Sequence, residues 1–143
     1  MQKNVLINVK GTQYLDDDKD VTELITTGSY YEKNNKEYIL YEEVSDDSLQ
    51  VTKNTLKLSE DEVELIRHGE SNVNIVFKAG VNWESYYMTP VGSMKMTFCT
   101  KEVYIDRSKD TSISIMIKYA IQFDYQTVAE YLMEIDIKEL ARQ

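Results

Sequence analysis

Two adjacent glutamates and one arginine are the charged residues whose positions predict a polar site. Glu42 and Glu43 lie in the alternating apolar segment 37–44, and Arg67 lies in the alternating segment 62–68. Neighbouring side chains of a β-strand point to opposite faces, so one of the two glutamates must face the interior. An internal carboxylate needs a partner, and an arginine cannot shed its proton. The residues therefore predict an internal Arg–Glu ion pair, which is either structural or the polar anchor of a ligand.

The parity of the Arg67 segment decides how much that pair contributes to stability. If Val63, Leu65 and Arg67 face the interior, removing Arg67 should cost about 3–5 kcal/mol, because the partner carboxylate is stranded. The opposite parity leaves Arg67 in water, where its removal is usually within about 0.5 kcal/mol. We expect the first arrangement.

A second string with chemical potential is the run 65–74, which reads Leu-Ile-Arg-His-Gly-Glu-Ser-Asn-Val-Asn. It resembles the signature of the histidine phosphatase superfamily, in which the histidine accepts a phosphoryl group. Within Arg67-His68-Gly69-Glu70, that resemblance would make His68 the nucleophile and Arg67 a phosphate ligand. The superfamily needs a second histidine and an α/β sheet, whereas this chain has one histidine and no predicted crossover helix. We therefore reject the phosphatase interpretation.

Three aspartates have the spacing of the first ligands of a calcium loop. Asp16, Asp18 and Asp20 occupy the first, third and fifth positions. Val21 then stands where glycine is required, and Thr27 stands where a bidentate glutamate should be. The run predicts an acidic, solvated connection, and no metal or cofactor is expected.

Tyrosines form the largest group of candidate ligand contacts. Tyr41 is expected in the barrel interior, and Tyr87 with Thr89 at its mouth. Phenol rings beside aliphatic side chains suit a pocket that holds an apolar ligand through a few polar contacts. The same rings could instead simply pack the interior and reach the rim with their hydroxyls. The tyrosines on predicted strands are Tyr30, Tyr31, Tyr38, Tyr41, Tyr86, Tyr87, Tyr104, Tyr119 and Tyr131.

Composition limits the classes of partner. The chain has 143 residues, 42% of them hydrophobic, and 16 Lys and Arg against 25 Asp and Glu give a net charge of -9. Nucleic acid and anionic membrane surfaces both require a basic footprint, so neither is expected as a partner. Cys99 is the only cysteine, which excludes an intramolecular disulfide. With neither a signal peptide nor an apolar run long enough to span a membrane, the sequence predicts a cytoplasmic protein.

The elements that must position these residues are strands. Apolar residues alternate most clearly from Ile113 to Phe123, and the alternation then repeats after a short turn. A change of parity predicts a bulge near 99–101. Ile137–Arg142 allows at most one short helix. Strands are predicted at about 4–11, 23–32, 37–44, 50–58, 62–68, 73–78, 83–88, 93–106, 113–123 and 129–138.

Short connections predict that each strand pairs with the next. Turn residues are found between the segments, such as Asn34-Asn35 and the only proline, Pro90. Eight to ten antiparallel strands joined in this way favour a single up-and-down barrel over a Greek-key sandwich. We therefore expect one all-β domain over residues 1–143, whose interior is either packed or holds one small ligand.

Several segments together resemble one family. These segments are Glu23-Leu24-Ile25-Thr26-Thr27-Gly28 with Tyr30-Tyr31-Glu32-Lys33, then Tyr38-Ile39-Leu40-Tyr41-Glu42-Glu43, Thr55-Leu56-Lys57-Leu58, Leu65-Ile66-Arg67-x-Gly69, and Tyr86-Tyr87-x-Thr89-Pro90-x-Gly92-Ser93. In order and spacing they are similar to the YwiB-like family of small bacterial proteins. The resemblance covers nearly the whole chain. It implies a calycin-type (lipocalin-like) β-barrel and a bacterial cytoplasmic setting, and it carries no activity.

Two functions follow as hypotheses. The first is a small-ligand binding module whose lumen holds an organic molecule, with Arg67, Tyr41 and Glu43 as polar anchors and Tyr87 and Thr89 at the mouth. The alternative is a packed barrel that acts as a protein-interaction or regulatory module, meeting a partner or a second copy as a homodimer. An enzyme is disfavoured because no catalytic set is recognisable. An open lumen would favour the first hypothesis.

Overall fold

Ten antiparallel strands make up the protein in the computed structural model, which describes residues 4–44, 50–69, 72–124 and 126–140. They cover nearly all of the described chain, and no helix occurs in those residues. The strands are β1 (Asn4–Leu15), β2 (Asp18–Lys33), β3 (Lys36–Val44), β4 (Val51–Leu58), β5 (Glu62–His68), β6 (Val73–Lys78), β7 (Asn82–Thr89), β8 (Gly92–Lys109), β9 (Ser112–Phe123) and β10 (Gln126–Glu139). The predicted all-β fold is confirmed.

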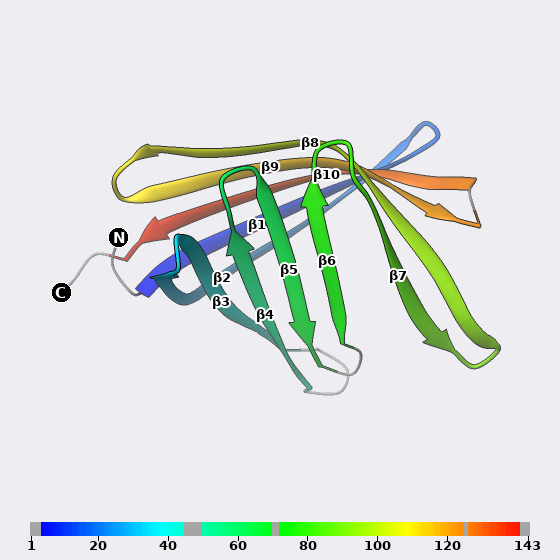
Figure 1. Cartoon of the computed structure of the whole chain (residues 1–143), viewed down its shortest axis with the longest axis horizontal. Coiled ribbons are helices and arrows are strands. Elements are labelled where there is room, and N and C mark those ends of the chain that lie inside the picture. The colour runs from blue at the N-terminus through cyan, green and yellow to red at the C-terminus, as the bar shows by residue number, and fades with distance from the viewer. Residues whose placement is uncertain (1–3, 45–49, 70–71, 125, 141–143) are drawn as a thin grey trace.

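The strands form one sheet that curls into a nearly closed barrel. Their order is β6-β5-β4-β3-β2-β1-β10-β9-β8-β7, so neighbours in the chain pair with each other throughout the series, apart from β6 and β7. The first and last strands close the sheet, because β1 pairs with β10. The two edges are β6 and β7, which diverge from the turn that joins them (Figure 1).

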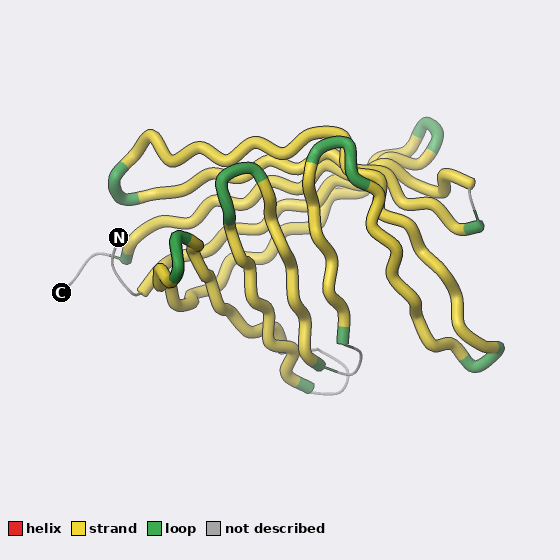
Figure 2. The backbone as a smooth tube through the Cα atoms, viewed as in Figure 1, coloured by secondary structure: helices red, strands yellow, loops and turns green. Residues whose placement is uncertain are grey.

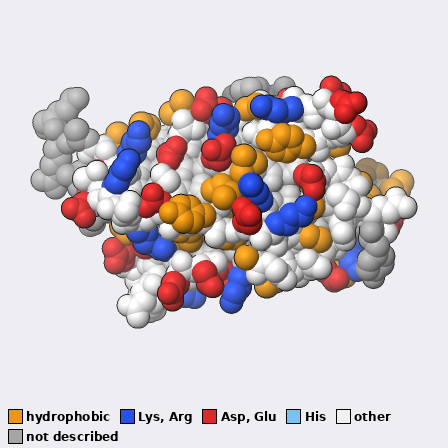
Figure 3. Space-filling model, turned by 90° about the horizontal axis from the view of Figure 1, so that it is seen from above, with side chains coloured by type: hydrophobic (Ala, Val, Ile, Leu, Met, Phe, Trp, Pro, Cys, Tyr) orange, Lys and Arg blue, Asp and Glu red, His pale blue; other side chains and the backbone are white. Residues whose placement is uncertain are grey.

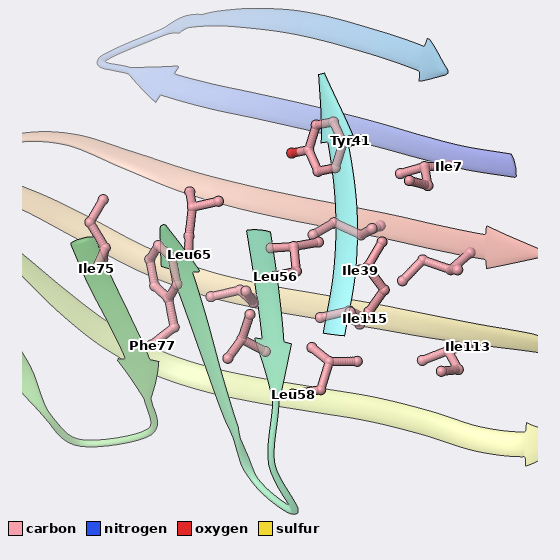
Figure 4. Close-up of a cluster of buried hydrophobic side chains, with 14 of the residues drawn as sticks. Ile7, Ile39, Tyr41, Leu56, Leu58, Leu65, Ile75, Phe77, Ile113 and Ile115 are labelled. Carbon is pink, nitrogen blue, oxygen red and sulfur yellow. The ribbon is translucent and has the colours of Figure 1, made fainter. Parts of the chain in front are cut away.

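The barrel has two halves that face each other. The long strands β8, β9, β10 and β1 run side by side, and β3 to β6 cross beneath them (Figure 1). Isoleucines of β9 and β10 meet apolar side chains of β3 to β6 between the halves, as the close-up in Figure 4 shows. The hydrophobic residues with at most 1% exposure are Val5, Ile7, Ile39, Leu56, Leu58, Val63, Phe77, Ile117, Ile135 and Ile137. The period-two pattern of the sequence therefore produces this core.

Turns and bulges lie where the sequence predicts them. Asn34 and Asn35 both have positive φ, 54° and 66°, in the two-residue turn between β2 and β3. The register of β8 against β9 shifts between Thr100 and Glu102, which is the predicted bulge. The shift keeps Phe98 and Val103 on the core side despite their odd spacing, because a bulge adds one residue to the strand. Figure 2 shows how short the connections are.

Two predicted boundaries are wrong. Strands β1 and β2 extend through the acidic run to a turn at Asp16–Asp17, where Asp16 has a φ of 50°. Strand β8 continues through Arg107 to Lys109, although its polar end was expected to be a turn. Most residues of both segments are exposed, and their apolar residues do not alternate regularly, so hydrophobic alternation could not mark them. Strand β10 runs to Glu139, so the described part of the region expected to allow a short helix is strand up to Glu139 and contains no helix.

The outer surface carries mixed charge. Seen from above, the layer formed by β8, β9 and β10 shows acidic and basic side chains interspersed with hydrophobic ones (Figure 3). Lys101 bonds Glu130 at 2.8 Å, and Ser114 donates to Asp136 at 2.8 Å on this face. The described residues contain no helix that could span a membrane.

Candidate functional site

Strands β3, β4 and β5 place a row of polar side chains on the inner face near one end of the barrel. Tyr41 lies opposite Asn54 in the β3–β4 ladder, and Asn54 lies opposite Arg67 in the β4–β5 ladder. Two residues further along β3, Glu43 lies opposite Thr52. The row continues the alternation that buries Ile39, Leu56 and Leu65 further along the same strands, so strand parity alone brings it together.

Arg67 and Glu43 form the ion pair that the sequence predicts. Arg67 Nη2 lies 3.7 Å from Glu43 Oε2, and the exposed fractions of the two side chains are 40% and 34%. The second oxygen of Glu43 accepts a hydrogen bond from Asn54 Nδ2 at 3.0 Å. Glu42 points to the outer face and is exposed, so Glu43 is the internal partner. The predicted parity is confirmed, but the pair is solvated rather than buried, and a cost of 3–5 kcal/mol for removing Arg67 is no longer expected.

Asn54 is the most buried polar residue of this row. Its exposed fraction is 1%, and its Oδ1 atom has no hydrogen-bond partner among the described residues. Asn54 is not among the predicted site residues, although its spacing indicates an inward side chain. It precedes Leu56 and Leu58 at intervals of two residues and must share their face. The Asn54 side chain holds Glu43 from the side away from Arg67 and so orients the carboxylate.

Tyr41 has a strongly perturbed phenol. Only 8% of the residue is exposed, and burial raises the pKa of Tyr41 from 10.0 to about 12. The negative charge of Glu43 adds to the rise in pKa, while the positive charge of Arg67 opposes it. Tyr41 is therefore a neutral hydrogen-bonding group at physiological pH and cannot serve as a base there.

A cavity of about 470 Å³ lies between the two halves of the barrel and begins at this polar row. One wall comes from β4, β5 and β6 and the other from β8, β9 and β10. Gln50 and Arg67 are the solvent-exposed rim, and the deeper lining is apolar and aromatic. The lining residues are Gln50, Thr52, Leu65, Arg67, Val73, Ile75, Phe77, Met96, Phe98, Tyr119, Ile121, Tyr131 and Met133.

Aromatic rings form the inner end of the cavity. The ring centroids of Phe77 and Tyr119 are 4.9 Å apart, and those of Phe77 and Phe98 are 6.2 Å apart at nearly right angles. Tyr131 stacks on Tyr119 at 5.2 Å. Such contacts lock the rings, so the cavity wall is rigid and offers flat apolar surfaces to a ligand. Figure 4 shows Phe77, Ile75 and Leu65 pointing into the space between the two halves.

The other predicted site residues are placed less completely. Tyr87 and Thr89 belong to β7, where they lie opposite Met94 and Gly92 of β8. Their side chains lie outside the described part of the structure, so their place at the mouth stays a prediction. The neighbouring Tyr86 is 65% exposed.

The string that resembles a phosphatase signature is split between the two faces of β5. Arg67 lines the interior cavity, whereas His68 is exposed and lines a hollow on the outer face. The two side chains therefore cannot act on one phosphoryl group. The aspartates of the calcium-like run lie along the β1–β2 hairpin, and in the described residues no three acidic, histidine or cysteine side chains gather as a metal site.

The hollow on the outer face is larger but of a different kind. It measures about 580 Å³ and is bordered by exposed polar side chains of β2 to β5, among them Thr27, Glu42, Lys53 and His68. The interior cavity has facing apolar walls and one charged group at its rim, which is the usual architecture of a small-molecule site.

A second polar cluster at the other end of the barrel was missed in the sequence. Arg107 of β8 donates from Nε to Glu37 of β3 at 2.6 Å and from Nη2 to the Ser59 carbonyl at 2.7 Å. The Tyr30 hydroxyl is 2.9 Å from both Glu37 Oε2 and Glu32 Oε1. Burial and these two carboxylates raise the pKa of Tyr30 well above its ordinary value. This cluster joins the two halves of the barrel through the Arg107–Glu37 contact.

Comparisons with known proteins agree with the architecture. The family model described as "Domain of unknown function (DUF1934)" matches residues 7–135. A curated relative, "Uncharacterized beta-barrel protein YwiB" of Bacillus subtilis (strain 168), is 32% identical over 106 residues, which is 74% of this chain and 73% of the relative. The crystal structure of the YwiB protein from Bacillus subtilis matches with a TM-score of 0.82 at 28% identity, covering 97% of this chain and 93% of that one.

Proposed function

The chain belongs to the DUF1934 family and is similar to the β-barrel protein YwiB, and on that premise we propose that it binds a small organic molecule inside its barrel. The observation that carries the proposal is the cavity of about 470 Å³ with apolar walls and a polar rim. Its volume lies within the range of about 300–1,000 Å³ that is usual for small-molecule sites. Arg67 is its polar anchor at the rim, whereas Glu43 and Tyr41, the other two predicted anchors, belong to the adjoining polar row and do not line the cavity.

The packing around the cavity supports binding rather than a structural void. Proteins fill their interiors to the density of organic crystals, and unfilled space lowers stability. Here the core is fully packed around Ile39, Leu58 and Ile137, whereas the cavity lies within the same barrel beside an exposed rim. Lumen binding is also in keeping, by analogy of fold, with the calycin-type barrel that the family resemblance of the sequence implies.

Methionine methyl groups provide a direct test in the unmodified protein. Of the six methionines, Met96 and Met133 line the cavity, while Met116 faces outward on β9. Titration with the neutral probe N-phenyl-1-naphthylamine should shift the ¹³C-methyl resonances of Met96 and Met133 and leave that of Met116 in place. Single Met→Leu variants assign the resonances. Shifts confined to Met116, or no shifts at all, would contradict lumen binding.

A matched pair of substitutions tests the same point by filling the cavity. Met133→Trp adds bulk inside the lumen, and Met116→Trp adds the same bulk outside it. We expect the first variant to lose probe fluorescence enhancement and the second to keep it. If Met133→Trp keeps both its fold and its probe binding, the probe binds elsewhere. If that variant fails to fold, the methyl titration of the wild type decides the question.

A second candidate function is interaction with another copy of the chain. The two sheet edges β6 and β7 are unpaired with each other in the described sheet, and an edge strand can pair with a further strand. Tyr86 and Met94 expose 65% and 42% of their surface on the β7–β8 hairpin beside that edge. Native mass spectrometry distinguishes the two functions, because a dimer that Tyr86→Ser disrupts would support interaction, while a monomer would oppose it.

A further inference from the structure

We propose that the ligand of this barrel is an organic carboxylate whose charged group binds Arg67 and whose apolar body lies against the aromatic rings. This inference rests on the proposed function and names the class of molecule. It follows from the sign of the charge at the rim, the freedom of the guanidinium and the chemistry of the wall.

The charge of the cavity is opposite to that of the protein. The chain has a net charge of -9, yet among the described residues that line the cavity Arg67 is the one charged side chain. Distant surface charges are screened within about 8 Å at physiological ionic strength. A ligand at the rim therefore experiences chiefly the local pair, in which Arg67 lines the cavity and Glu43, 3.7 Å from it, does not. Contact with the lining cation favours an anionic group over a cationic one.

The guanidinium of Arg67 has donors to spare. Its contact with Glu43 is 3.7 Å long, and the described residues offer it no closer side-chain acceptor. Glu43, in contrast, is held at 3.0 Å by Asn54. An arginine carries five N–H donors in a planar fork that fits a carboxylate in bidentate fashion. A ligand carboxylate can therefore take the free side of the fork without displacing Glu43 from Asn54.

Arg67 is the one cation of the described lining and already faces Glu43 at 3.7 Å, so it can accommodate at most a single further negative charge. A phosphate monoester brings nearly two charges, and neutralising it would need further cations that the described lining does not contain. Thr52 adjoins the pair, since it lies opposite Glu43 and lines the cavity, so its hydroxyl can donate to the same group. The rim thus provides one charged and one neutral donor, which suits a carboxylate.

The lining below the rim determines what the uncharged part of the ligand must be. Below Arg67 and Thr52 the described lining is formed by Leu65, Ile75, Phe77 and other apolar or aromatic side chains. A flat hydrocarbon body can stack against the Phe77 and Tyr119 rings, which lie 4.9 Å apart at an angle of 52°. The geometry therefore points to an amphipathic monocarboxylate that enters with its charge outward.

Two probes that differ in charge alone test the inference. Naphthalene-2-carboxylate and naphthalene-2-carboxamide are titrated into the full chain at pH 7, with binding read from the Met96 and Met133 methyl shifts. The carboxylate should bind at least about tenfold more tightly than the amide, the ratio given by one good charge-assisted contact. Equal affinities would overturn the carboxylate inference and leave lumen binding intact, whereas no methyl shift with either probe would overturn the proposed function itself.

Variants at the rim assign the preference to Arg67. Arg67→Gln should abolish the difference between the two probes, and Glu43→Gln should raise carboxylate affinity about threefold or more by removing the competing anion. Lys53→Gln is the matched control, since Lys53 is a cation on the outer face of β4 next to Asn54. A carboxylate preference that survives Arg67→Gln, or that disappears in Lys53→Gln, would contradict the assignment. If Arg67→Gln does not fold, the Glu43→Gln variant decides the point. A carboxylate affinity equal to that of the wild type would then contradict the assignment to Arg67.

Discussion

The two ends of strand β3 each present an inward glutamate, and the two glutamates are used differently. Glu37 meets Arg107 of the opposite half at 2.6 Å, and its side chain is 16% exposed. Glu43 meets Arg67 of its own half at 3.7 Å, and its side chain is 34% exposed. One pair therefore crosses the barrel, while the other remains within β3 to β5.

The difference indicates which contacts accompany close packing of the two halves and which accompany a cavity between them. At the Glu37 end, the crossing pair joins β8 to β3, and fully buried side chains such as Leu58 fill the space beside it. At the Glu43 end no described ion pair joins the halves, and the cavity lies there. A polar contact that spans the halves accompanies packing, whereas a local contact leaves the halves apart.

The largest effect should come from the packing difference itself. Leu58→Ala removes a side chain with 0% exposure next to Glu37, and we expect it to cost about 3 kcal/mol of unfolding free energy. Met133→Ala removes a side chain that already borders empty space, so about 1 kcal/mol is expected. Urea unfolding of both variants measures the contrast. Equal losses would show that the cavity end is as tightly packed as the other.

The next largest effect concerns the crossing pair. Arg107→Ala leaves Glu37 with only the Tyr30 hydroxyl, which Glu32 shares, and removes the donor to the Ser59 carbonyl. The cost is expected at about 2 kcal/mol, below the 3–5 kcal/mol of a fully buried pair because the Arg107 side chain is one-third exposed. Lys101→Ala, which breaks an exposed pair within one half of the barrel, is the control and should leave the urea midpoint unchanged. If both variants behave alike, the crossing pair does not hold the halves together.

Alkaline pH sharpens the comparison through Tyr41 at the open end. Burial raises the pKa of Tyr41 to about 12 in the folded chain, so the unfolded chain, at an ordinary 10.0, releases its proton first. The associated stability is complete below pH 10 and is lost as the pH rises toward 12. By pH 11 the wild type should lose about 1.4 kcal/mol that Tyr41→Phe does not lose.

The control for this titration is Tyr104→Phe, because Tyr104 is 61% exposed on the outer face. Its stability should follow that of the wild type between pH 9 and pH 11. A Tyr41→Phe curve that also follows the wild type would mean that water reaches the phenol from the cavity, and the open end would then be wetter than its geometry indicates.

Much of the fold was predictable because strand parity is a local property. Alternating side chains predicted all ten strands, and Arg67 with Glu43 on the inner face followed from the same rule. The gap between β6 and β7 was not predictable, and there the expectation that each strand pairs with the next is wrong. The turn at Gly80 looks like the other connections, yet the Gly80 N–H donates to the Thr100 carbonyl of β8 instead of starting a β6–β7 ladder. Turn residues specify local geometry, and long-range pairing leaves no comparable signal.

The candidate site was predictable only in part for a related reason. Asn54 and Arg107 are inward polar residues on strands, but a polar residue interrupts alternation and makes a strand look as if it ends. Arg107 was assigned to a turn because it stands among Asp106, Ser108 and Lys109. The aromatic wall combines Phe77, Phe98 and Tyr119 from three distant segments, and their meeting depends on how the halves cross. No single segment encodes that crossing.

The smallest expected effect is the most informative about the Glu43 end. Arg67→Ala should change the unfolding free energy by about 0.5 kcal/mol or less, because a solvated pair at 3.7 Å gains little Coulomb energy and its arginine is 40% exposed. Asn54 still satisfies one oxygen of Glu43 in that variant, so the carboxylate is not left without a partner. Urea unfolding beside Arg107→Ala gives the comparison under one condition. A loss for Arg67→Ala as large as that for Arg107→Ala would show that Arg67 holds the open end structurally. A guanidinium whose N–H donors hold the structure together would have few donors free for a ligand. The carboxylate preference would then have to come from another group.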